Sequence, residues 1–202
     1  MTDGAGIDRP VWDVVYLVSC AMGGAPADAG RVEKMDLDAV YRVSQRHLLV
    51  SVCATALESA GVSDERFARA RGMAVRKAVL MDTERAELFR RMDAAGIWHL
   101  PLKGCVLQGL YPSYGMRQMA DNDILFDAER ADGMRLSDED FYVYLVAHEY
   151  KHFVACGTGL RSLLDAFVWL RAKVIFEHDF ERAGRPRHDC GIGRRRCFRW
   201  YG

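Results

Sequence analysis

The chain has 202 residues, half of them hydrophobic, and its formal net charge at pH 7 is zero. This composition is typical of a soluble globular protein and argues against a disordered, highly charged chain. No apolar run approaches the roughly 20 residues of a membrane span, and the apolar stretch over 14–22 lacks the flanks of a signal peptide, so we expect neither.

Apolar residues recur at helical spacing through most of the first 96 residues. We expect one helix over 10–22, one that starts from a cap at Asp36 or Asp38, and one over 48–60. Ser63 is the predicted N-cap of a longer helix that ends near Gly96. Residues 1–96 are therefore predicted to form a helical N-terminal region.

The pattern changes after Gly96 and defines a second region, residues 97–135. Residues 97–102 are short, apolar and aromatic, which predicts a buried strand. A short helix is expected to about residue 110, and 122–126 is the second predicted strand. Residues 127–135 have the pattern of a helix that is cut short.

Two motifs in this second region carry the chemistry. Lys103-Gly104 follows the first strand in a loop that could hold phosphate. Asp121 and Asp123 are two residues apart, so in a strand they would point to the same face and could clamp a divalent metal ion for a nucleotide. A solvated strand end remains the alternative for the aspartates. Lys103 could be a surface lysine, and Arg117 could pair with a carboxylate.

The sequence after residue 135 reads as a helical pair and a tail. Ser137 with Asp140 three residues later forms a capping box, and the helix should run to Cys156, where Gly157 follows. A second helix is expected over 160–175. We assign 136–178 to a helical C-terminal region and 179–202 to a disordered basic tail. Its seven arginines could bind nucleic acid electrostatically, although a solvated end is favoured.

Residues 148–152 satisfy the H-E-x-x-H pattern, which on a helix places both histidines on one face. Taken alone, the pattern suggests a zinc peptidase with Glu149 as base and Glu177 as a distant third ligand. Five-residue matches also occur by chance, so this stays a minor alternative. His188, Cys190 and Cys197 have poor spacing for a metal site.

The six cysteines are scattered, and no Cys-x-x-Cys pair occurs. The first four lie in apolar sequence and are expected to be buried free thiols. Such cysteine usage is typical of a reducing compartment, so we expect a cytoplasmic protein.

The two motifs resemble a poorly characterised bacterial nucleotidyltransferase family, with an LKG motif over 102–104 and an R-x-M-x-D-x-D-x-L motif over 117–125. Residues 81–85, 138–144, 148–153 and 157–165 resemble the same family, so the resemblance extends from about Trp12 to Lys173. It implies an α+β, mostly helical fold with a reduced nucleotidyltransferase core over 97–135. It also implies transfer of a nucleoside monophosphate from a nucleoside triphosphate (NTP) to an acceptor that the sequence does not identify.

The resemblance also implies roles for single residues. Asp121 and Asp123 would be catalytic and would hold Mg²⁺ against the triphosphate. Gly104 would let the backbone approach phosphate, and Lys103 would supply a positive charge there. Arg117 would bind phosphate or orient the aspartates.

The chain departs from the family pattern in two places. A stretch that carries a third carboxylate on a later strand is missing between Arg135 and Leu136, which suggests an internal deletion. The arginine-rich end after Lys173 is also unlike the family. A non-catalytic remnant that binds nucleotide or a partner is therefore the main alternative to an active transferase.

Overall fold

The computed structural model describes residues 8–127, 136–157 and 159–182, and these form a mostly helical α+β fold, as predicted. The helices before the sheet are α1 (Arg9–Gly23), α2 (Ala29–Val32), α3 (Leu37–Arg46), α4 (Val50–Ser59) and α5 (Glu65–Ala94). The later elements are β1 (Trp98–Pro101), α6 (Gly104–Gln108), β2 (Ile124–Asp127), α7 (Asp138–Cys156) and α8 (Leu160–Arg182). None of the helices, over the residues described, is long and apolar enough to cross a membrane.

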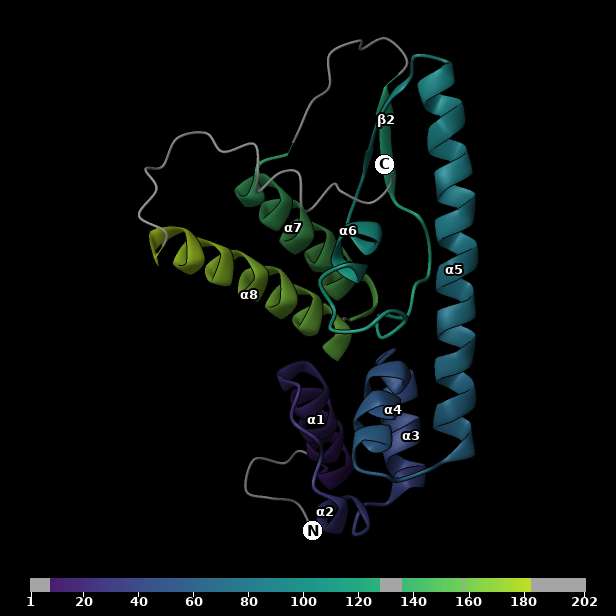
Figure 1. The fold of residues 1–202 in the computed structure, drawn as a ribbon, viewed down its shortest axis with the longest axis vertical. Helices are drawn as coiled ribbons and strands as arrows, with labels where there is room; N and C mark the ends of the chain where they lie inside the picture. The colour runs from purple at the N-terminus through teal and green to yellow at the C-terminus, as the bar shows by residue number, and fades with distance from the viewer. Residues whose placement is uncertain (1–7, 128–135, 158, 183–202) are drawn as a thin grey trace.

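The long helix α5 spans most of the length of the molecule (Figure 1). Its N-terminal half packs against the small bundle of α1, α3 and α4, and its C-terminal end leads into the strands. The bundle is held by side chains that are at most 1% exposed: Val14, Leu17, Val40, Cys53, Leu57 and Phe67. The apolar faces predicted by periodicity for α1, α3 and α4 therefore form the main core, whereas on α5 the predicted apolar residues Met73, Val79 and Leu80 are exposed.

The helix caps confirm one prediction and correct another. The carboxylate of Asp36 accepts a hydrogen bond from the backbone N–H of Ala39 at 3.0 Å and caps α3. At the start of α5 the predicted cap, Ser63, is wrong by one residue. Asp64 caps the helix instead, accepting from the backbone N–H groups of Arg66 and Phe67. A carboxylate is also favoured there by the positive end of the helix dipole.

The described strands pair antiparallel, with Trp98 opposite Asp127 and Pro101 opposite Ile124. The second strand begins at Ile124, two residues later than predicted. Asp121 and Asp123 therefore lie in the segment that leads into β2 and not within it. This segment is drawn toward α5 because the side-chain N–H of Asn122 donates to the carbonyl of Met81 at 3.2 Å.

Helices α7 and α8 lie side by side and extend away from α5, and α8 also contacts α6 (Figure 1). The predicted capping box is present, since Ser137 and Asp140 each accept from the other's backbone N–H. The rings of Phe141 and Trp169 lie 4.2 Å apart and join the two helices. Helix α8 continues to Arg182, beyond the predicted end at residue 175.

Several sequence predictions fall outside the described residues. They are most of the interrupted helix predicted over 127–135, the proposed deletion site next to it, and most of the basic tail predicted over 179–202. Where these predictions can be compared with the structure they are wrong, because Asp127 ends β2 and residues 179–182 belong to α8. Of the four cysteines predicted to be buried free thiols, Cys53 is buried, whereas the prediction of burial is wrong for Cys20 and Cys105, which are partly exposed. All three are free thiols, and the side chain of Cys156 lies outside the described part of the chain.

Candidate active site

The loop after β1 has a strained backbone at Lys103. This residue has φ 34° and ψ −92°, a conformation that favours glycine. Its side chain is buried, and its Nζ donates to Oε1 of Glu149 on α7 at 2.5 Å. A residue type that is rarely buried thus occupies a costly backbone conformation and makes a close ion pair.

Glu149 is also bound from a second direction. The hydroxyl of Ser162, in the first turn of α8, donates to Oε2 of Glu149. The side chain of Glu149 is 17% exposed and that of Lys103 is 7% exposed. The central glutamate of the H-E-x-x-H pattern is therefore engaged in holding the lysine of the first motif.

Gly104 lies where the two motif loops meet. A Cβ atom at this position would approach Nη1 of Arg117 to 3.2 Å and Cε of Met119 to 3.3 Å, and the carbonyl oxygen of Asp121 to 3.7 Å. A side chain at this position would crowd Arg117 and Met119, because the second motif packs directly against Gly104. The LKG loop (residues 102–104) and the segment over 117–123, called the aspartate segment below, are consequently neighbours in space.

Arg117 is engaged with a carboxylate from α8. Its Nε and Nη2 donate to Oδ1 and Oδ2 of Asp165, both at 2.9 Å, and the hydroxyl of Tyr111 donates to Oδ1 of Asp165 at 2.7 Å. Arg117 is 4% exposed and Asp165 is fully buried. Burial by itself lowers the pKa of Arg117, but attraction to Asp165 outweighs it and the pKa is raised. The guanidinium therefore stays charged.

The aspartate segment is held through its backbone carbonyl groups, which accept hydrogen bonds from three other parts of the chain. The backbone N–H of Leu102 donates to the carbonyl of Asp123 at 2.8 Å. From α5, Lys77 donates to the carbonyl of Ala120 at 3.2 Å, and from α8, Arg161 donates to the carbonyl of Gln118 at 3.2 Å. The carboxylates of Asp121, which is exposed, and Asp123, which is partly exposed, remain accessible to solvent.

A buried network between α5 and Asn122 was missed by the motif reasoning. Arg85 donates to Oδ1 of Asn122 at 2.8 Å and to Oδ1 of Asp82 at 2.5 Å. The hydroxyl of Tyr114 donates to Oδ2 of Asp82 at 2.6 Å. These residues position the aspartate segment, and the resemblance over 81–85 was the sequence signal that could have identified two of them.

Helix α7 faces the two aspartates. The pKa of Tyr144 is raised by burial and then by the negative charges of Asp123 and Asp121. The pKa of His148 is lowered by burial, by Lys103 and by His152, while Asp123 acts in the opposite direction. Both carboxylates thus lie close enough to one helix to change the pKa of its side chains.

The two histidines of the H-E-x-x-H pattern come together as the spacing predicts. Nε2 of His148 and Nε2 of His152 lie 2.9 Å apart. Within the described part of the chain, no three His, Cys, Asp or Glu side chains are grouped so that they could hold a metal ion. The side chain of Glu177 and residues 188, 190 and 197 lie outside it.

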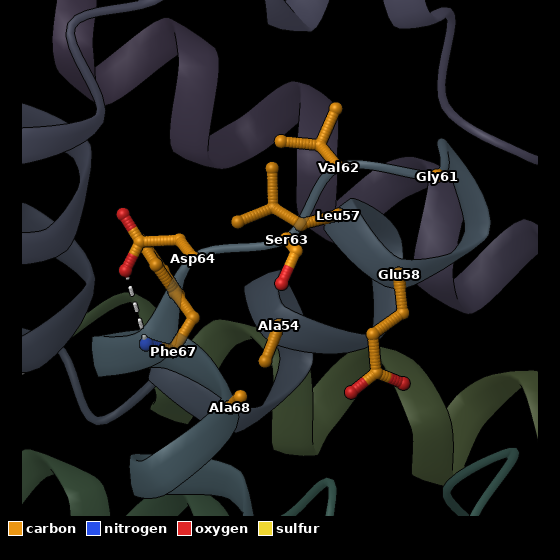
Figure 2. Close-up of a pocket in the computed structure, with 9 residues that line it drawn as sticks. All are labelled: Ala54, Leu57, Glu58, Gly61, Val62, Ser63, Asp64, Phe67 and Ala68. Carbon is orange, nitrogen blue, oxygen red and sulfur yellow. Dashed lines mark hydrogen bonds between the residues drawn. The ribbon is translucent and has the colours of Figure 1, made fainter.

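A separate pocket of about 330 Å³ lies between α4 and the start of α5 (Figure 2). Ser63 lines this pocket together with the apolar side chains of Leu57 and Phe67. None of the predicted site residues contributes to its lining. The pocket is therefore distinct from the two motif loops.

The family of the chain follows from a comparison with models of known families. The model of a family described as uncharacterised nucleotidyltransferase matches residues 33–135, just over half of the chain. The chain belongs to this nucleotidyltransferase family. The matched segment contains α3 to β2 and both motif loops, whereas α7 and α8 lie outside it. No curated protein and no solved structure shows significant similarity to the chain.

Proposed function

We propose that the protein transfers a nucleoside monophosphate from an NTP to an acceptor. The observation that carries this proposal is the contact at Gly104, where the Lys103 loop packs against the aspartate segment. This contact supports a single site to which the buried cation of Lys103 and the carboxylates of Asp121 and Asp123 contribute. Membership of the nucleotidyltransferase family supports the same reaction class.

The donor set of the site suits Mg²⁺. Asp121 and Asp123 offer hard carboxylate oxygens that solvent can reach, and Mg²⁺ is commonly held by one or two carboxylates together with water and substrate phosphates. We therefore propose these two residues as the Mg²⁺ ligands. Bound Mg²⁺ would supply neutralisation of the phosphate charge.

The reaction would need positioning more than covalent chemistry by the protein. An acceptor oxygen would attack the α-phosphorus, the bond to the β-phosphate bridging oxygen would break, and pyrophosphate would leave. Lys103 would hold a phosphate oxygen through its ammonium group. Asn122 and Arg85 would keep the aspartates in place during the reaction.

Of the two roles predicted for Arg117, the contacts favour orientation of the aspartate segment. Its guanidinium donates to both carboxylate oxygens of Asp165 through Nε and Nη2, and Arg117 is 4% exposed. A phosphate oxygen would have to displace a well-formed buried pair to reach it. We propose that Arg117 supports the backbone that leads to Asp121.

The test is label transfer from each of four α-³²P-labelled NTPs in the presence of Mg²⁺. Fractionated cellular protein, RNA and small molecules serve as acceptor pools. Asp123→Asn and Asp121→Asn should each reduce transfer at least a hundredfold, since a metal ligand is lost. Asp93→Asn is the matched control, because Asp93 is an exposed carboxylate on α5. Transfer that survives in Asp123→Asn would refute the assignment.

A non-catalytic nucleotide-binding protein is the second candidate. It is favoured by one observation: among the described residues, no third carboxylate or histidine joins Asp121 and Asp123 in a metal site. In this case Mg·NTP would bind, and binding would depend on Asp123, but no acceptor pool would become labelled. Peptidase chemistry is disfavoured since Glu149, its required base, is bound to Lys103 and Ser162.

A further inference from the structure

The ion pair between Lys103 and Glu149 links the first motif to a helix outside the matched segment. Glu149 lies on α7, whereas the family match ends at residue 135. The pair is close, at 2.5 Å, and both side chains are largely removed from solvent. Such a pair is expensive to bury, so its presence next to a phosphate-binding loop calls for an explanation.

The backbone at Lys103 adds a second cost at the same residue. A non-glycine residue with φ 34° and ψ −92° keeps that conformation only where its surroundings determine it. The ion pair with Glu149 holds the side chain of Lys103, and the packing of Gly104 against the second motif holds the backbone next to it. The ammonium of Lys103 is therefore held in one place before any ligand arrives.

We propose that Glu149 is a positioning residue of the nucleotide site, which fixes the Lys103 ammonium where the triphosphate binds. This inference rests on the proposed nucleotidyl transfer. An ammonium group has three donors, so Lys103 can keep its bond to Glu149 and still donate to phosphate oxygens. Ser162 holds Glu149 in turn, so that α8, α7 and the loop form a relay of contacts.

The inference makes a different prediction from a purely structural ion pair. If the pair only stabilised the fold, loss of Glu149 would lower the melting temperature and leave nucleotide affinity unchanged in the folded protein. If Glu149 acts through Lys103, its loss should weaken nucleotide binding, and only while Lys103 is present. A double-mutant cycle separates the two cases.

The experiment measures the Kd of MgATP, MgGTP, MgCTP and MgUTP by calorimetry for the full chain. Glu149→Gln and Lys103→Met should each weaken binding about tenfold or more, the size expected for a lost charge-assisted hydrogen bond. The double variant should bind no more weakly than Lys103→Met alone. Glu149→Asp, which keeps the charge, should recover part of the affinity and replaces Glu149→Gln if that variant does not fold.

Glu87→Gln is the matched control, because Glu87 pairs with Arg90 on the exposed surface of α5. It should leave all four affinities unchanged. Additive losses in the double variant, or normal affinity in Glu149→Gln, would overturn the inference while leaving the proposed transfer intact. Tighter binding in Glu149→Gln would also overturn it, since Glu149 would then compete with phosphate. Absence of binding in the unaltered chain would defeat both proposals.

Discussion

Replacement of Asp165 by asparagine is the sharpest test of how the candidate site is supported. The substitution keeps the size of the side chain but removes the charge that Arg117 contacts through two bonds of 2.9 Å. Since Arg117 is 4% exposed, its charge would remain buried without a counter-charge. Loss of one partner of a buried pair costs about 3–5 kcal/mol.

This cost is large compared with the stability of the whole domain, which is typically about 5–15 kcal/mol. Urea unfolding followed by circular dichroism at 222 nm should therefore show a clearly lower urea midpoint for Asp165→Asn. The slope of the unfolding free energy against urea concentration should stay unchanged. A loss below about 1 kcal/mol would refute the reasoning, because it would show that solvent or another group compensates Arg117.

A combined replacement covers the case in which Asp165→Asn does not fold. Arg117→Met, Asp165→Leu and Tyr111→Phe together remove both charges and the hydroxyl that donates to Asp165. Apolar side chains of similar volume often replace a buried ion pair without loss of stability. The triple variant should accordingly be more stable than Asp165→Asn. If it is less stable, the destabilisation comes from packing and not from the uncompensated charge.

Two further predictions concern stability. Gly115→Ala should lower the free energy of unfolding by about 2–4 kcal/mol, because the backbone has φ +78° and a Cβ there would lie 2.4 Å from Cγ2 of Val75. Gly96→Ala, with φ +68° and open space around the Cβ, should lower it by only about 1–2 kcal/mol. Equal losses for the two variants in chemical denaturation would contradict the steric argument. His47 accepts from the backbone N–H of Leu160 at 3.3 Å, and burial and Arg46 lower its pKa below 6.5. Its contribution to stability should therefore be complete above pH 6.5 and be lost as the pH falls through the lowered value, and His47→Asn should flatten this pH dependence in urea titrations.

Local sequence signals predicted most of the helices and most of their ends, although the short helix α2 was not predicted. Ser137 caps α7 because Asp140 three positions later completes the box, and Asp36 caps α3 because its carboxylate accepts from the backbone N–H of Ala39. At the start of α5, Ser63 and Asp64 are both good caps, so the local sequence does not decide between them. Boundaries of this kind depend on tertiary context.

The candidate site could be predicted only in part. The motifs identified Lys103, Gly104 and the two aspartates, and the resemblance linked them to nucleotidyl transfer. The contacts of Glu149 and Asp165 with the motif loops could not be predicted, because no periodicity or spacing relates residues that are far apart in the chain. Strand alternation was the wrong reason to place Asp121 beside Asp123, since both residues precede the strand.

The buried pair of Arg117 and Asp165 has a consequence for how this chain can be divided. A fragment that ends with the matched segment at residue 135 would keep the arginine and lose its counter-charge. Such a fragment would also lose the helix that packs on Arg117, which leaves an uncompensated cation next to the aspartate segment, and it should be less stable than the full chain. We therefore expect the motif loops and the first turns of α8 to belong to one folding unit.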